Sequence, residues 1–338
     1  MKGILRYAIT RILLTIPMLW VLLTLVFIIL RVMPGDPVIS LLGAHAPPEV
    51  IEQKREELGL NEPVIVQYFD YLGQLARFDL GNSMVLNQRV STPIMEKLPA
   101  TLELVVCGMA FTLLLGVPLG AYAARHRRTG RDTAIRLYSN IVYCMPVYWM
   151  GLMFQLIFGI WLGWLPVAGR TGPRVFPSTF ERTGFYVIDS ILAGNFHALG
   201  DVLVHLLLPS ITLGVVLSGV FVRLTRANML DILKSDFVLA ARARGVRERF
   251  VVYRHGLKNA FVPILTMIGL QFALLLANAI LTETTFSWPG MARLLVERIY
   301  LRDYPTIQGV IVVFALIVSA ISLLVDVIYA MVDPRVKY

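Results

Sequence analysis

The chain has 338 residues, of which 57% are hydrophobic and only 16% are charged, and it carries a formal net charge of +9. Soluble domains contain about 25% charged residues, so this composition argues against a soluble enzyme and indicates an integral membrane protein. The positive charge is concentrated in particular segments, which favours a role in membrane topology over nucleic-acid binding. Both cysteines, Cys107 and Cys144, lie in apolar runs. We therefore expect buried thiols, with no disulfide or metal framework.

Six apolar runs are long enough to cross a bilayer, which takes about 20 residues. A signal peptide is the alternative for the first run, but it is long for that purpose and no small-residue cleavage site follows it. Pro146 interrupts the third run. We expect membrane spans at residues 12–30, 101–124, 137–163, 202–226, 260–281 and 307–332.

Basic residues gather in alternate connecting segments, and such segments are retained in the cytoplasm. This pattern predicts that both termini are cytoplasmic. The interval 31–99 is richer in acidic residues and is predicted to lie outside, as an ordered subdomain with one helix from about Pro48 to Leu58 and another from Pro63 to about Ala76. The predicted organisation is a first span in residues 1–30, an extracytoplasmic subdomain in 31–99, and a membrane core in 100–338 with a cytoplasmic loop at 226–258.

The segment from Ser235 to Lys258 is the longest strongly basic interval between two apolar runs. Its first half contains four small residues, Ala240, Ala241, Ala243 and Gly245, and small side chains allow another backbone to approach closely. We expect a short helix, a turn at Gly245 and a second amphipathic helix along the membrane surface. The alternative is a solvated loop that only sets topology, and such a loop does not need small residues.

This segment resembles the cytoplasmic loop of ABC importer permeases, whose pattern is Glu-Ala-Ala, three residues, Gly, nine residues, Ile, one residue, Leu-Pro. Four positions match, whereas Leu239, His255 and Lys258 replace the pattern's Glu, Ile and Pro. The resemblance implies that the first helix docks on an ATPase through its backbone and small side chains. The residues that it assigns to this coupling are Phe237, Ala240, Ala241, Arg242, Ala243, Arg244, Gly245 and Leu257.

Further motifs extend the resemblance from end to end, to the subgroup that serves dipeptides, oligopeptides and nickel. The resemblance implies an all-α integral membrane protein with six transmembrane helices, type I ABC importer architecture and a small helical extracytoplasmic insertion. It also implies pairing with a homologous permease, two cytoplasmic ATPases and an extracytoplasmic binding protein in a bacterial or archaeal plasma membrane. Short peptides are the expected substrates, with nickel complexes or oligosaccharides as alternatives. The motifs are Pro34-Gly35-Asp36-Pro37, Phe78-Asp79-Leu80-Gly81, Pro99-Ala100-Thr101-Leu102-Glu103-Leu104, Phe286-Ser287-Trp288-Pro289-Gly290 and Asp333-Pro334-Arg335.

Motifs for catalysis are missing from the sequence. It contains no Walker A motif, no His-Glu-x-x-His and no Gly-x-Ser-x-Gly, and its five histidines lack metal-ligand spacing. We therefore expect a non-catalytic subunit that binds no cofactor or metal, with ATP and Mg bound by partner ATPases. An ATP-independent channel or a transporter driven by ion gradients is the rival, but such proteins usually carry several ionisable residues within the membrane or broken helices, and Asp326 alone is thin support for it.

Six residues are candidates for the translocation pathway or its gates. Asp326 lies deep in the last predicted span, where it either lines the path for an ammonium group or pairs with an arginine in helix packing or an inner gate. Glu103 and Glu283 lie at outer span ends and either line the mouth or are solvated. Trp288, Pro289 and Gly290 predict a rigid outer turn. This turn is either a re-entrant scoop that plugs the pore or contacts the binding protein, or an interfacial aromatic anchor.

Overall fold

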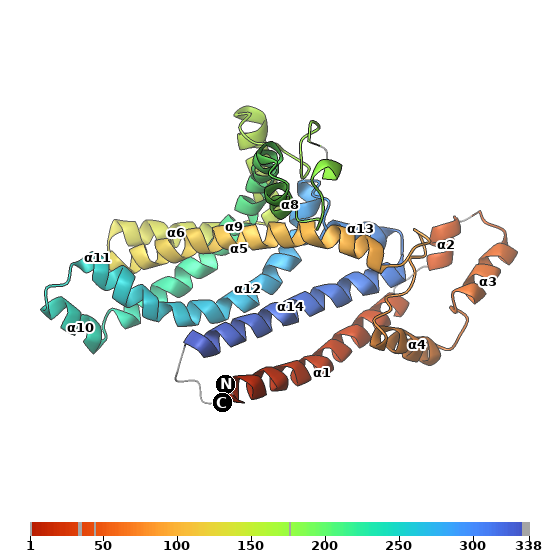
Figure 1. The fold of residues 1–338 in the computed structure, drawn as a ribbon, viewed down its shortest axis with the longest axis horizontal. Coiled ribbons are helices and arrows are strands. Elements are labelled where there is room, and N and C mark those ends of the chain that lie inside the picture. Colours follow the sequence, from red (N-terminus) through yellow and green to blue (C-terminus); the bar gives the residue numbers. More distant parts are fainter. Residues whose placement is uncertain (1, 33–35, 44, 176, 333–338) are drawn as a thin grey trace. The chain divides into compact units, whose positions relative to one another are not determined.

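The computed structural model describes residues 2–32, 36–43, 45–175 and 177–332. Their regular elements are helices, apart from an isolated bridge between Asn82 and Arg89 (Figure 1). Internal contacts divide the chain into two compact units, one formed by residues 9–98 and 290–319, the other by residues 1–8, 99–289 and 320–338. One point of division, between residues 98 and 99, lies beside the predicted boundary at residue 99. The unit that contains the predicted extracytoplasmic interval also includes most of the first span and residues 290–319. The extracytoplasmic subdomain itself stays a prediction.

The smaller unit contains most of α1 (Lys2–Val32), four short helices and the start of the last long helix. Two of the short helices match the sequence prediction closely. In both, a proline comes just before or at the first helical residue. An N–H at that position has no acceptor within the helix, so proline, which lacks an N–H, costs no hydrogen bond there. The elements are α2 (Pro37–Leu42), α3 (Pro48–Glu57), α4 (Val64–Ala76), α13 (Met291–Tyr300) and the first half of α14 (Tyr304–Val332).

The larger unit is built around α9 (Phe196–Ile232), which contacts α6, α7, α8 and α12. The other helices of this unit are α5 (Ser91–Arg125), α6 (Gly130–Cys144), α7 (Val147–Phe154), α8 (Tyr186–Leu192), α10 (Asp236–Ala243), α11 (Glu248–Phe250) and α12 (Leu257–Thr285), with a π-helix at 155–161 and another at 251–256.

Five described helices are long and apolar enough to cross a membrane: Leu13–Val32, Ser91–Arg125, Phe196–Ile232, Pro263–Thr285 and Tyr304–Tyr329. The predicted third span is instead a bent pair, Gly130–Cys144 and Val147–Trp161, with an angle of 104° between them. Met145 is extended, as residues before proline tend to be, and Pro146 has no N–H to continue the helix. The six-helix prediction therefore holds only if this broken pair counts as one span. The fourth helix also begins six residues earlier and ends six residues later than predicted.

The expectation of buried thiols is wrong. Cys144 is exposed and Cys107 is only partly buried. In a soluble protein an apolar run indicates burial, but a membrane helix also has apolar side chains on the surface that faces lipid. An apolar environment in the sequence therefore does not distinguish the interior of this protein from its lipid-facing surface.

Helices α5 and α9 approach each other at glycine positions. A Cβ built on Gly116 would lie 2.5 Å from the Cβ of Phe221, and one on Gly120 would lie 2.7 Å from both the Cβ of Thr225 and the carbonyl oxygen of Val222. Gly116 and Gly120 form a Gly-x-x-x-Gly motif, the spacing that lets membrane helices pack backbone against backbone. These glycines therefore fix the distance between α5 and α9.

We predict that Gly120→Ala separates the two helices, because the added methyl group meets the α9 backbone. Overpacking of this kind typically costs about 1–3 kcal/mol. Thermal unfolding of the detergent-solubilised chain should give a lower midpoint for this variant. The matched control is Gly130→Ala, since a Cβ at Gly130 has no neighbour within 4 Å. Equal midpoints for the two variants would contradict the packing argument.

Candidate functional site

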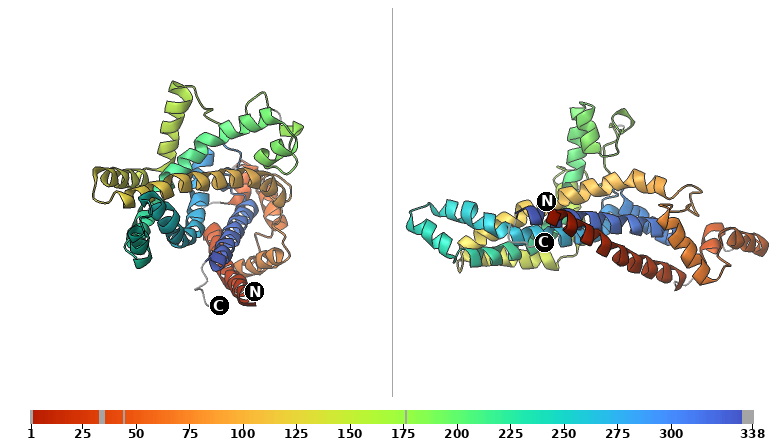
Figure 2. Two further views of the ribbon diagram at one scale, coloured as in Figure 1. Left: turned by 60° about the vertical axis from the view of Figure 1, so that its left-hand side comes forward. Right: turned by 60° about the horizontal axis from the view of Figure 1, so that its bottom comes forward.

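Helix α10 is held by its own chain along one side. The side chains of Val238 and Ala241 are buried, in a cluster that also contains Met229 from α9, Val251 from the π-helix and Ala260 from α12. Figures 1 and 2 place α10 in the turn between α9 and α12. Two of the eight helical residues thus fix its orientation, and the opposite side is left exposed.

A glycine ends this helix. Gly245 has a φ of +74°, its N–H donates to the carbonyl of Arg242 at 2.9 Å, and the N–H of Val246 donates to the carbonyl of Ala241 at 3.2 Å. This is the Schellman arrangement, in which a residue with positive φ closes a helix and the next residue contacts the last turn. Val246 accordingly packs against the same buried cluster. The predicted turn at Gly245 is confirmed. The turn requires a left-handed backbone at this position, which glycine adopts without steric cost.

A helix follows Gly245 as predicted, but it is not a separate helix, because it runs without a break into α12. After Gly245 the chain forms α11, of three residues, then the π-helix at 251–256, and it continues directly into α12. The apolar residues at helical spacing belong to the start of a membrane helix, and Val251 and Val252 are buried in the cluster that holds α10. Helical periodicity alone could not distinguish a surface helix from the extension of a span.

The predicted coupling residues fall into two groups. Ala241 and Leu257 pack into the protein's own core, so their side chains position α10 and are not free for a partner. On the exposed side, Phe237 is 45% exposed and Leu239, which occupies the position of the family's Glu, is 51% exposed. The remaining exposed positions are Ala240, Arg242, Ala243, Arg244 and Gly245.

Arg242 connects the two halves of the segment. Its Nη2 lies 2.8 Å and its Nε 3.2 Å from the carboxylate oxygens of Glu248, and its Nη1 donates to the carbonyl of Leu233 at 3.3 Å. The hydrogen bonds from this guanidinium lower the pKa of Glu248 below its usual value, although partial burial acts in the opposite direction. Arg242 was predicted to couple to a partner, whereas the structure gives it contacts within the chain.

A buried ion pair at the other basic turn was missed by the sequence reasoning. Asp132 is 1% exposed and accepts hydrogen bonds from Arg226 Nε at 2.7 Å and Nη2 at 2.8 Å, and from the backbone N–H of Arg128 at 3.1 Å. The pair joins the start of α6 to α9. The signal in the sequence was Asp132, a single acidic residue among the arginines from 125 to 136. The positive-inside rule counts basic residues, so it gives such an acid little weight.

Glu103 is buried and is not a solvated carboxylate. It is 8% exposed, its Oε2 accepts from Arg170 Nη2 at 2.7 Å, and its Oε1 accepts from the N–H of Val187 at 2.9 Å. The Arg170 guanidinium also lies 3.5 Å from the ring centroid of Tyr186. Glu103 therefore ties α5 to the segment between α7 and α9, and its place at the outer mouth stays a prediction.

That segment is itself ordered by an acidic side chain. Asp189 in α8 accepts hydrogen bonds from the backbone N–H groups of Arg182, Thr183 and Gly184, at 2.9 to 3.0 Å. Burial acts to raise the pKa of Asp189, but these hydrogen bonds to its charged form outweigh that effect and hold its pKa below the usual value. Asp189 thus fixes the backbone at Gly184, whose carbonyl accepts a hydrogen bond from Arg170 Nη2 at 2.7 Å.

The residues at the end of α12 are buried as well. Glu283 is fully buried and accepts from the hydroxyl of Thr101 at 2.6 Å. Trp288 is fully buried, and its indole N–H donates to the carbonyl of Ala100 at 2.9 Å. A turn is present as predicted, with Ser287 at a φ of +48°, and its role as a re-entrant scoop stays a prediction. The interfacial-anchor interpretation of Trp288 is wrong, because its ring packs inside the protein.

For the other three pathway candidates, Pro289, Gly290 and Asp326, the structure gives burial but no role. Pro289 is half-buried, and Gly290 is buried as the residue before α13. Asp326 lies half-buried in α14, next to Val325, which contacts Gly269 of α12. Both interpretations of Asp326, pathway lining and an arginine partner, stay predictions. Within the described residues, no group of three or more His, Cys, Asp or Glu side chains could hold a metal ion.

The described residues thus form a membrane protein whose long helices α9 and α12 are joined by a short, partly exposed helix, and its class is shown by comparison with known proteins. Residues 116–338 match the family described as the binding-protein-dependent transport system inner membrane component, and residues 4–105 match its N-terminal membrane component. The chain belongs to this family of ABC transport permeases.

Curated relatives are similar over almost the whole chain. The dipeptide transport system permease protein DppB of Alkalihalophilus pseudofirmus is 42% identical over 99% of this chain and 100% of its own length. The di/tripeptide permease DppB of Pseudomonas aeruginosa is 38% identical over 96% of each chain. The glutathione permease GsiC of Pectobacterium atrosepticum is 36% identical over 99% of each chain. The resemblance inferred from the motifs is thereby confirmed.

We predict that Glu103→Gln destabilises the protein strongly, because it leaves the Arg170 charge buried without its carboxylate partner. Removing one member of a buried pair typically costs about 3–5 kcal/mol. The control is Glu297→Gln in the exposed pair with Arg293, where the expected effect is about 0–1 kcal/mol. Chemical unfolding followed by tryptophan fluorescence would compare them. Similar losses of unfolding free energy in both variants would show that burial does not make the Glu103–Arg170 pair more important for stability.

Proposed function

We propose that this chain forms half of the translocation pathway of an ATP-driven importer for short peptides. The observation that carries the proposal is the full-length similarity to permeases named for dipeptide, di/tripeptide and glutathione transport, at 36–42% identity. The complex would contain a homologous permease, two cytoplasmic ATPases that bind ATP and Mg, and an extracytoplasmic binding protein. Nickel complexes and oligosaccharides are the alternative cargo, and the names of these relatives favour peptides.

The exposed side of α10 is the proposed docking surface for the ATPase. Its side chains are small or apolar apart from Asp236, Arg242 and Arg244, and Arg242 is engaged by Glu248 of the same chain, which suits insertion of the helix into a groove. The opposite side shares one buried cluster with α9 and α12. A displacement imposed on α10 would therefore be passed directly to two long helices, which is the coupling that alternating access between inward-open and outward-open states requires.

The proposed topology places α10 and both chain termini in the cytoplasm of a bacterial or archaeal cell. The basic residues around Arg125–Arg131 and Arg242–Lys258 support this orientation, because positively charged loops are retained on the cytoplasmic side. The interval 31–99 then lies outside, on the side from which a binding protein would deliver cargo. The chain itself is proposed to be non-catalytic.

We predict that Ala240→Trp abolishes ATPase binding and leaves the subunit folded. Ala240 is exposed on α10, so the added bulk meets a partner and not the protein's own core. The affinity-tagged chain would be purified from detergent-solubilised membranes and assayed for copurifying ATP hydrolysis and for its unfolding temperature. The control for added bulk is Gly73→Trp in α4, a helical position where an added Cβ has no neighbour within 4 Å.

Gly245 is a poorer choice for this experiment. Any other residue there is strained by the positive φ, so a loss of coupling could reflect a distorted turn and not a blocked surface. Retention of ATPase by Ala240→Trp would remove the docking assignment. Cargo movement by the purified chain in liposomes without ATP or an ATPase would favour the channel or secondary-transporter alternative.

We expect uptake of radiolabelled dialanine to depend on this chain in its native cells. A deletion strain should lose uptake, and the restored gene should recover it. Competition by excess unlabelled tripeptide but not by nickel or an oligosaccharide would support peptide cargo. Unchanged dipeptide uptake in the deletion strain, with loss of nickel accumulation, would assign the alternative cargo.

A further inference from the structure

We propose that α4 is an interfacial helix, with its apolar flank in the lipid acyl region beside α1 and its polar flank on a hydrated cavity. This inference concerns the smaller unit only and does not depend on which cargo is transported. It rests on three observations: the distribution of side chains around α4, the depth at which α4 meets α1, and the cavity on the opposite flank.

The side chains of α4 separate into three sectors around the helix, with successive residues roughly 100° apart. Tyr68 and Tyr71 face α1. On one flank, Ile65, Phe69, Leu72 and Ala76 follow the spacing i, i+4, i+7, i+11, and Ile65 and Phe69 are 61% and 63% exposed. On the other flank lie Gln67, Asp70 and Gln74. The only charged residue of the helix is thus on the flank away from the exposed apolar stripe.

Contacts with α1 fix the depth of this helix. The hydroxyl groups of Thr24 and Tyr68 lie 2.7 Å apart, and the ring of Phe27 is 5.3 Å from that of Tyr68 and 5.7 Å from that of Tyr71. Thr24 and Phe27 lie eight and five residues before Val32, where the candidate span ends. At 1.5 Å per residue these positions are about 12 Å and 8 Å inside the end of the span.

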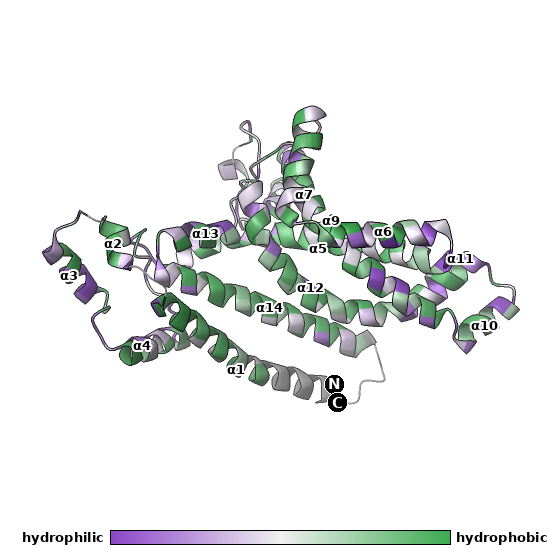
Figure 3. Cartoon of the chain, turned by 180° about the vertical axis from the view of Figure 1, so that it is seen from behind, coloured by the Kyte–Doolittle hydropathy of each residue, from purple (hydrophilic) through white to green (hydrophobic). Residues whose placement is uncertain are grey.

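With Val32 taken as the boundary between headgroups and acyl chains, these contacts lie just below that boundary, in the outer part of the acyl region. Amphipathic helices on membranes typically bury their apolar side about 5–10 Å into that boundary. On α1 itself, the neighbouring residues Leu25 and Ile29 are 52% and 57% exposed. The apolar stripe of α4 therefore adds to an apolar surface that α1 already presents at the same level, and Figure 3 shows α4 beside this end of α1.

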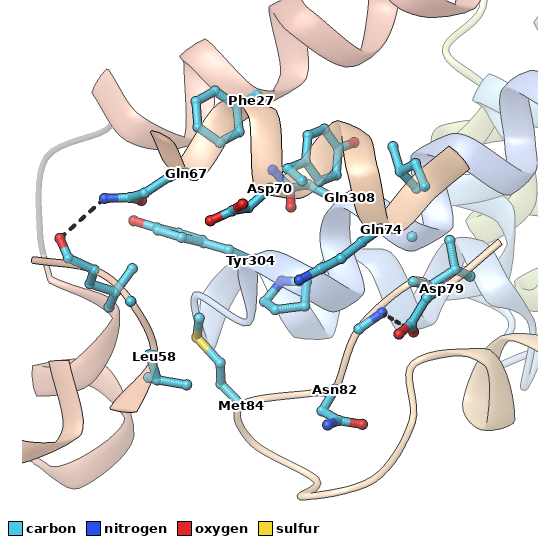
Figure 4. Close-up of a pocket in the computed structure, with 18 of the residues that line it drawn as sticks. Phe27, Leu58, Gln67, Asp70, Gln74, Asp79, Asn82, Met84, Tyr304 and Gln308 are labelled. Carbon is cyan, nitrogen blue, oxygen red and sulfur yellow. Dashed lines mark hydrogen bonds between the residues drawn. The ribbon is translucent and has the colours of Figure 1, made fainter. Parts of the chain in front are cut away.

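A cavity of about 500 Å³ lies along the polar flank of α4. Gln67, Asp70 and Gln74 line it together with Tyr304 and Gln308 from α14, and Figure 4 shows these side chains around one space. Carboxylates and amides in a cavity of this size are suited to contact with water. The helix thus separates a polar environment on one flank from an apolar one on the other, as an interfacial helix does. On the proposed topology this is the outer leaflet.

Spin-label accessibility tests the proposal. In the full-length protein with both native cysteines replaced, single cysteines at Phe69, Gln74 and Ile29 would carry a nitroxide, and the assembled transporter would be reconstituted in liposomes. Oxygen concentrates in the acyl region, whereas a neutral nickel chelate stays in water. We expect oxygen accessibility to exceed nickel accessibility at Phe69 and at the α1 reference Ile29, and the order to reverse at Gln74.

Two results would overturn the proposal. Higher nickel than oxygen accessibility at Phe69 would place the apolar stripe in water. Low accessibility to both probes at Phe69, with high oxygen accessibility at Ile29, would mean that another protein surface covers the stripe. Because Phe69 and Gln74 are both exposed, neither cysteine is expected to disturb folding, and unchanged unfolding temperatures of the labelled variants would verify this.

Discussion

Close backbone packing between α5 and α9 is the constraint on which the larger unit depends. In lipid, helices gain little from hydrophobic association, so contact depends on van der Waals packing at short distance. The glycines of α5 and Gly214 of α9, where an added Cβ would clash with Phe111, permit that distance. Because α9 also contacts α6, α7, α8 and α12, its position relative to α5 determines where the rest of the unit can pack.

Two buried ion pairs act on this helical framework at different levels of the larger unit. Asp132 and Arg226 hold the turn between α5 and α6 against α9, and Glu103 and Arg170 hold the loop after α7 against α5. Separating either pair would leave a charge without its partner in a poorly hydrated place. Helix motions that accompany transport therefore cost least if elements joined by an ion pair move together. The larger unit would then rearrange as a few rigid groups of helices, and single helices would not move independently.

Local signals in the sequence predicted several elements correctly. The prolines before α3 and α4 marked their starts, hydropathy located the long helices, and Gly245 marked a turn whose backbone has positive φ. These features depend on residues near one another in the chain. By contrast, Glu103 meets Arg170 from 67 residues away, and Trp288 meets Ala100 from 188 residues away. No local pattern carries such pairings, so residues predicted for a pore mouth proved to be buried. Pro146 was recognised in the sequence as an interruption of the third span, but the sequence did not give the 104° angle between α6 and the helix that follows it.

The two-sided character of α10 has a consequence for how such a subunit can evolve. Its fold depends on Val238 and Ala241, while the residues proposed to meet an ATPase lie on the other side and make few contacts within the chain. Mutations on the outer side can therefore accumulate at little expense to folding, and the two sides can drift separately. After a gene duplication, a few substitutions on this surface could change which ATPase one copy binds. Related permeases could then use the same ATPase or different ones.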